Sequence, residues 1–160
     1  MATLNYIITL LAIIGTGLIA GTFFVFSVAI MPAFRRLPAN EGLAAMQSIN
    51  LVIQNPIFLG VFMGTALISL ALAVMSIVNW NAPHKYYILA GAALYVIGSF
   101  LLTIVFNVPL NNALDAADAT TASGHEFWAN YMTDWTFWNH VRTVASILSA
   151  VAFSLAFASK

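Results

Sequence analysis

Amide, imidazole, guanidinium and indole side chains gather in two short segments of an otherwise apolar chain. The first is Asn107-Val-Pro-Leu-Asn111 and the second is Trp135-Thr-Phe-Trp-Asn-His-Val-Arg142. In the first segment, two carboxamide dipoles could hold an oxygen atom of a ligand, or they could cap a helix that stops at Pro109. Because a proline disfavours helical geometry at the residue before it, we predict that a membrane span ends here on irregular backbone.

The second segment continues an aromatic stripe. If one helix runs from Gly124 to the end of the chain, its aromatic and cationic side chains at helical spacing share a face: Phe127, Tyr131, Trp135, Trp138 and Arg142. The stripe is either an aromatic belt at the lipid headgroups, with Arg142 reaching toward water, or the wall of a binding site. At about 100° per residue, His140 points almost opposite to the stripe, and Asn139 lies between the two directions.

Charged residues are too scarce for a soluble protein. The chain is 62% apolar and 6% charged, whereas soluble domains contain roughly 25% charged residues. No charge falls between Met1 and Phe34, between Gly42 and His84, or between Tyr86 and Asn112. The solvent of these stretches is therefore lipid, and we predict an integral membrane protein of the cell or cytoplasmic membrane.

Net charge and cysteine content exclude other classes. The formal net charge is zero, so no basic surface argues for a nucleic-acid partner. The chain has no cysteine, which excludes disulfides, thiolate-ligated haem, iron–sulfur clusters and a cysteine nucleophile.

Four apolar stretches have the length of a membrane span, at about 4–31, 56–80, 86–106 and 141–159. They predict an all-α fold, a transmembrane four-helix bundle that forms one integral membrane domain over 1–160. Both termini should lie on one face of the membrane, with the Arg35 and Asp115 connections on the other.

The sequence predicts the starts of two further helices, one in the first connection and one in the third. In the first connection, Asn40 precedes Leu43, Met46, Ile49 and Ile53 on roughly one face, which predicts an amphipathic interfacial helix. In the third connection, Ser123-Gly-His-Glu126 has the spacing of a capping box, so a helix should begin at Gly124 and run into the fourth span.

Two pairs of glycines at a spacing of four suggest close helix contacts. Gly17 with Gly21, and Gly60 with Gly64, are small-xxx-small pairs that let helix backbones approach in lipid. They either pack inside the bundle of one chain, which we favour, or join copies of the chain into a homo-oligomer.

A metal site and the common catalytic motifs find little support. His125, Glu126, Asp134 and His140 could be imagined as a two-histidine, one-carboxylate set, but their spacing has no recognised signature. Ser-His-Asp arrangements, phosphate loops and dinucleotide fingerprints are absent from the sequence. We therefore predict no metal and no redox cofactor.

Several motifs together resemble one family. They are Met31-Pro-Ala-Phe-Arg-Arg-Leu, the Asn55-Pro56 helix start, Phe106-Asn-Val-Pro-Leu-Asn111 and Trp135-x-x-Trp-Asn-His-Val-Arg142. In this order, over nearly the whole chain, they are similar to the anthrone oxygenase-like family of small four-span membrane proteins. Fungal members oxidise an anthrone to an anthraquinone with molecular oxygen, while most bacterial members have no assigned reaction. The resemblance therefore implies a fold more firmly than a substrate.

The resemblance implies a cofactor-independent oxygenase acting on a planar aromatic molecule. An anthrone can be deprotonated to an electron-rich anion that reduces oxygen itself. His140 would be the base, while Asn107, Asn111 and Asn139 would stabilise the developing enolate oxygen and Arg142 would supply charge. Trp135 and Trp138 would stack on the flat ligand.

Two other functional classes stay open. A quinone- or lipid-binding accessory protein would use the same Trp and Asn wall without turnover. A transporter is disfavoured, because coupled carriers usually place an ionisable group inside a span and the first three spans have none.

Overall fold

Four long helical rods make up the protein. The computed structural model describes residues 2–81 and 83–159, and these ranges contain helices and no strand. In chain order, with η for π-helical segments, the elements are α1 (Ala2–Val25), η1 (Phe26–Ile30), α2 (Met31–Phe34), α3 (Ala39–Ile53), α4 (Pro56–Val78), α5 (Lys85–Tyr95), η2 (Val96–Leu101), η3 (Thr103–Asn107), α6 (Val108–Asp115) and α7 (Ala122–Ala158). Four helices are long and apolar enough to cross a membrane: Leu4–Phe34, Pro56–Val78, Lys85–Asp115 and Ala122–Ala158. The predicted all-α fold with four spans is confirmed.

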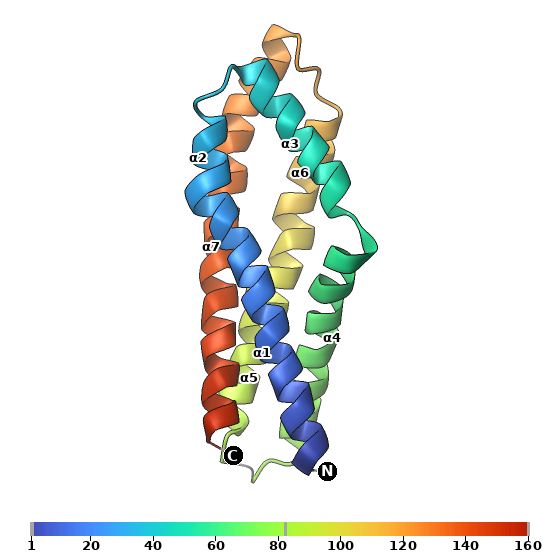
Figure 1. The fold of residues 1–160 in the computed structure, drawn as a ribbon, viewed down its shortest axis with the longest axis vertical. Coiled ribbons are helices and arrows are strands. Elements are labelled where there is room, and N and C mark those ends of the chain that lie inside the picture. Colours follow the sequence, from blue (N-terminus) through green and yellow to red (C-terminus); the bar gives the residue numbers. More distant parts are fainter. Residues whose placement is uncertain (1, 82, 160) are drawn as a thin grey trace.

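The four rods form one antiparallel bundle (Figure 1). α1 packs against α7 and α4, and α5 packs against the same two helices. The start of α1, the α4–α5 link and the end of α7 lie together at one end, while α2, α3 and the start of α7 lie at the other. The two termini are therefore on the same side, as the sequence predicts.

Hydroxyl groups bind the helices to one another inside the bundle. Ser149 Oγ donates to the carbonyl of Gly91 at 2.7 Å, and Ser146 Oγ donates to Ser99 Oγ at 3.0 Å. Tyr95 donates to the carbonyl of Phe62 at 3.0 Å. Because lipid tails are as apolar as leucine, such bonds and close packing, rather than a hydrophobic drive, hold spanning helices together.

The glycines that make close helix contacts are not the ones that the spacing indicates. A Cβ added to Gly15 would collide with Thr65, and one added to Gly98 would lie 2.7 Å from Ala145. At Gly17, Gly21, Gly60 and Gly64, by contrast, an added Cβ would meet nothing within 4 Å. Packing of these two pairs inside the bundle, the alternative that we favoured, is therefore wrong, since both pairs face outward.

The third rod does not end at Pro109. Val108 has helical φ and ψ of −63° and −46°, and the helix continues to Asp115. The π-helical turn η3 explains this, because the N–H of Val108 bonds to the carbonyl of Thr103, five residues back. The wider turn moves the preceding carbonyls away from the proline ring, so the predicted irregular backbone is wrong.

The predicted helix in the first connection exists as α3, which packs against α6 and α7. It begins at Ala39 with Pro38 at the cap position, two residues earlier than a cap at Asn40 predicts. Leu43 and Met46 are buried against Trp128 and Tyr131 of α7. α3 therefore covers the end of the bundle; its position at the lipid interface stays a prediction.

The fourth rod is one continuous helix, as predicted, but its cap differs. Thr121, not Ser123, accepts the N–H of Gly124 through its Oγ1 at 3.1 Å, so α7 begins at Ala122. The turn before it is fixed by Asp118, which accepts from Thr120 Oγ1 at 2.7 Å and Thr120 N at 2.8 Å. These two bonds, the side-chain one first, lower the pKa of the Asp118 carboxyl.

Candidate functional site

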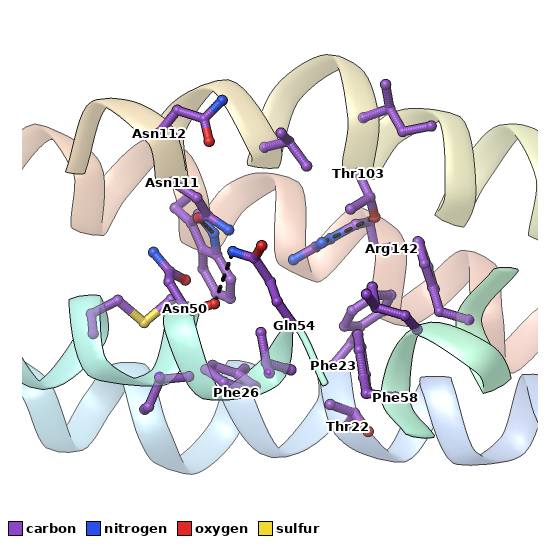
Figure 2. Close-up of a pocket in the computed structure, with 18 residues that line it drawn as sticks. Thr22, Phe23, Phe26, Asn50, Gln54, Phe58, Thr103, Asn111, Asn112 and Arg142 are labelled. Atoms are coloured by element: carbon purple, nitrogen blue, oxygen red, sulfur yellow. Dashed lines mark hydrogen bonds between the residues drawn. The ribbon is translucent and has the colours of Figure 1, made fainter. Parts of the chain in front are cut away.

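A cavity of about 270 Å³ lies inside the bundle beneath α3, near the lower end of the size range of small-molecule sites. Its residues come from α1, η1, α3, α4, η3, α6 and α7. Aromatic rings make up much of its lining: Phe23, Phe26, Phe58, Phe62 and Trp135. The polar lining consists of one guanidinium, two hydroxyls and four amides: Arg142, Thr22, Thr103, Asn50, Gln54, Asn111 and Asn112 (Figure 2).

Arg142 is a buried cation, 3% exposed, whose hydrogen-bond partners are all neutral. Nη1 donates to Thr103 Oγ1 at 3.1 Å and Nη2 donates to Asn139 Oδ1 at 2.8 Å (Figure 2 draws the first). Its guanidinium carbon lies 4.2 Å from the ring centroid of Phe23 and 5.2 Å from that of Trp135. Nε is buried without a hydrogen-bond partner. The surroundings of this desolvated cation are therefore dipoles and aromatic faces, an environment in which a negatively charged oxygen beside it would be favoured.

Asn111 presents its amide nitrogen as the group available to a ligand. Its Oδ1 accepts from Tyr131 Oη at 2.9 Å and from Trp135 Nε1 at 2.8 Å. An indole N–H can only donate, so the atom facing Trp135 must be the oxygen. With the oxygen occupied twice, the N–H groups of Asn111 are the donors left for a molecule in the cavity.

Asn139 stands behind the cavity wall and orients Arg142. Its Nδ2 donates to the carbonyl of Phe23 and to Ser27 Oγ, each at 2.8 Å, while its Oδ1 holds Arg142. The side chain is fully buried. Both N–H groups of the Asn139 side chain are thus bonded to α1 and η1, while its oxygen holds the guanidinium relative to these two elements.

His140 lies outside the cavity, on the exposed face of α7. Its Nδ1 is 2.9 Å from Ser27 Oγ, which also contacts Thr143 Oγ1 at 3.1 Å. The Thr143 hydroxyl donates to the carbonyl of Asn139, so Ser27 must donate to Thr143. Satisfying every contact then requires His140 to donate through Nδ1–H, which leaves Nε2 as its proton acceptor.

The remaining predicted residues lie beside the cavity. Asn107 is fully buried, and its Nδ2 donates to the carbonyl of Trp135 at 3.4 Å while its Oδ1 has no partner. Trp138 is half-buried and stacks on Phe106, with ring centroids 3.6 Å apart. Of the seven predicted residues, the structure therefore places Asn111, Trp135 and Arg142 in the cavity lining, Asn107 and Asn139 against these residues, and Trp138 and His140 outside.

The sequence reasoning missed the contributions of α1, η1, α3 and α4 to the cavity. Phe23 and Phe26 come from the first rod, Phe58 and Phe62 from α4. Asn50 of α3 and Gln54, which directly follows α3, carried a usable signal, since they follow Met46 at helical spacing on a face that should be apolar. Within the described residues, no group of three His, Cys, Asp or Glu side chains is arranged to hold a metal.

The comparison with family models decides the family. The model described as anthrone oxygenase matches residues 58–152, more than half of the chain. The chain belongs to the anthrone oxygenase family. The matched region of this family member contains Thr103, Asn111, Trp135 and Arg142, whereas α1 and α3, which complete the cavity, precede it. No curated protein and no solved structure matched the chain.

Proposed function

We propose that this anthrone oxygenase family member oxidises a planar, anthrone-type aromatic molecule with molecular oxygen, without a redox cofactor. In such a monooxygenase-type reaction, the methylene carbon between two aromatic rings loses two hydrogens and gains one oxygen atom. The second oxygen atom leaves as water. The observation that carries the proposal is Arg142, a buried cation with a free Nε at the wall of an aromatic cavity.

Arg142 would act by favouring the anion of the substrate. Loss of a methylene proton places negative charge on the anthrone oxygen, and a preorganised cation in a cavity that excludes water stabilises that charge strongly. The N–H groups of Asn111 would donate to the same oxygen. Asn139 and Asn107 would act from behind the wall, by orienting Arg142 and the backbone of Trp135.

The flat ring system would lie among Phe23, Phe26, Phe58 and Trp135. Trp138 stacks on Phe106, and neither ring lines the cavity, so Trp138 would not touch the ligand. The resulting anion is electron-rich and can transfer an electron to oxygen directly, so the protein needs only to bind, ionise and shield the substrate.

His140 stays the proposed base, with two added conditions. His140 must carry its own proton on Nε2 instead of Nδ1, and the Ser27 hydroxyl must turn from Thr143 to donate to Nδ1. Ser27 would then pass its hydroxyl proton to Nδ1 as its oxygen takes the proton of the substrate. The electrostatic role of Arg142 does not depend on this rearrangement.

The deciding experiment is oxygen uptake by the purified protein in lipid nanodiscs supplied with anthrone. We expect oxygen consumption and anthraquinone absorbance above those of empty nanodiscs. Arg142→Gln should abolish the difference, whereas Arg36→Gln, an exposed arginine remote from the cavity, should retain it. Saturable binding without oxygen uptake would instead support the alternative of a quinone- or lipid-binding accessory protein.

A homo-oligomer is the remaining proposal for the outward glycine pairs. They leave open backbone surface on α1 and α4, two neighbouring helices of the bundle. A second copy of the chain could approach closely at that surface.

A further inference from the structure

The cavity is closed toward the water at the α3 end of the bundle. Leu43 and Met46 of α3, Leu114 of α6 and Tyr131 of α7 are at most 1% exposed and belong to one cluster. Gln47 ties α3 to the third rod, because its Nε2 donates to the carbonyls of Leu114 and Ala117 at 2.9 and 3.0 Å. A ligand that came along the bundle axis would have to break this layer.

The side of the cavity is open and apolar. Leu59 of α4, Ile104 of η3 and Val108 of α6 line the cavity and are also 37%, 47% and 39% exposed. We call these three residues the side mouth. α4 packs mainly against α1, α5 and η2, whereas α6 packs against α3 and α7. The backbones of α4 and α6 are therefore not closely packed against each other, and only side chains fill the space between them.

The depth of the side mouth in the membrane follows from helix length. α4 has 23 residues and begins at Pro56, so it extends about 34 Å, close to the roughly 30 Å of a hydrocarbon core. Leu59 is in its first turn and therefore lies near the boundary of the hydrocarbon. Two exposed amides, Gln54 and Asn112, line the same cavity (Figure 2), and Gln54 comes two residues before α4 begins.

We propose that the cavity is filled from the bilayer through the side mouth, by an aromatic amphiphile dissolved in the lipid. Its flat apolar body passes between Leu59 and Val108, while its polar end stays at headgroup depth beside Gln54 and Asn112. This route takes the ligand to Arg142 without exposing the cation to bulk water. The proposal rests on the proposed function only for the identity of the ligand.

The test uses variants that narrow the side mouth. Leu59→Trp and Val108→Trp place a bulky ring in it, and Leu67→Trp and Ile97→Trp are matched controls on the same two rods. Both control positions are exposed, at 67% and 61%, and neither lines the cavity. Each of these four variants carries one added tryptophan, so the mouth and control variants have the same number of tryptophans when quenching of their fluorescence by anthraquinone is compared.

In lipid vesicles, we expect the two mouth variants to slow anthraquinone association by about ten-fold or more, and the two controls to keep the parent rate. Val108→Ala, which widens the mouth, should associate at least as fast as the parent protein. Circular dichroism and gel filtration would exclude unfolded variants, and Val108→Ala provides a comparison that does not depend on accommodating a large ring.

Equal association rates in the mouth and control variants would overturn the proposal. So would the absence of saturable quenching in the parent protein. If the mouth variants slow anthraquinone binding but the parent protein does not oxidise anthrone, the side mouth is supported and the proposed function is contradicted. The failure of one proposal can therefore be distinguished from the failure of the other.

Discussion

Arg142 lies over the ring of Phe23, with its guanidinium carbon 4.2 Å from the ring centroid. The contact joins α7 to α1 at the wall of the cavity and gives the cation an aromatic face where a soluble protein would usually supply a carboxylate. The contact thereby holds the positive charge of Arg142 in place without neutralising it.

Replacing Arg142 by Met should remove the activity of the protein without lowering its stability. The substitution leaves Asn139 Oδ1 unpaired, which costs about 1 to 3 kcal/mol, but it also removes a buried charge whose desolvation costs several kcal/mol. We expect thermal stability in detergent to stay unchanged or rise, while anthrone oxidation falls by about 100-fold or more. A large loss of stability with oxidation retained would show that Arg142 is a structural residue.

Asn111→Leu should destabilise the protein, because it leaves both Tyr131 Oη and Trp135 Nε1 without an acceptor. Two orphaned donors should lower the free energy of unfolding by about 2 to 5 kcal/mol. Asn112→Leu is the matched control, since Asn112 is exposed and its substitution should change stability little. Equal denaturation midpoints for the two variants would contradict the role of Asn111 as the shared acceptor.

His140→Ala tests the proposed base. The side chain is exposed, so its removal should change the free energy of unfolding by no more than about 1 kcal/mol. If His140 takes the substrate proton, the oxidation rate should fall by about 100-fold to 10,000-fold. Ser27→Ala should lower the rate in the same way, because Ser27 connects His140 to the cavity wall. Normal oxygen uptake by His140→Ala would end this assignment.

Gly15→Ala should loosen the contact between α1 and α4, because the added Cβ would collide with the Thr65 hydroxyl. Overpacking of this kind typically costs about 1 to 3 kcal/mol. Gly17→Ala, two residues along the same helix, meets no neighbour and is the control. Thermal melts of the two variants should differ clearly, with only the first destabilised.

Gly60→Leu combined with Gly64→Leu tests the homo-oligomer. An added Cβ at either position meets nothing within 4 Å, so the fold should be retained. If copies of the chain associate through this surface, energy transfer between labelled proteins in vesicles should fall with the double substitution. Leu67→Ile, an exposed position on the same helix, should leave the transfer efficiency unchanged. Undiminished energy transfer in the double variant would exclude this face as the contact.

The sequence by itself determined that the chain is a helical membrane protein with four spans. The absence of charges from long apolar stretches is decisive for this. A charged side chain in hydrocarbon is costly because of its residue type, so the pattern can be read without knowing which helices pack together. The two polar segments also indicated Asn111, Trp135 and Arg142 as candidate site residues, and all three line the cavity. Amides and a guanidinium are unusual next to apolar spans, so they stand out in the sequence alone.

Only the tertiary structure decided which of these side chains face a common space. The packing of α7 buries Asn139 behind the cavity wall, and the π-helical turn at Thr103–Asn107 carries the third rod past Pro109 so that Asn111 reaches the cavity. Phe23, Asn50 and Phe58 join it from elements distant in the chain. The glycine pairs likewise show that a spacing of four does not by itself locate the close helix contacts inside the bundle, because helix rotation depends on the packing of all the rods together.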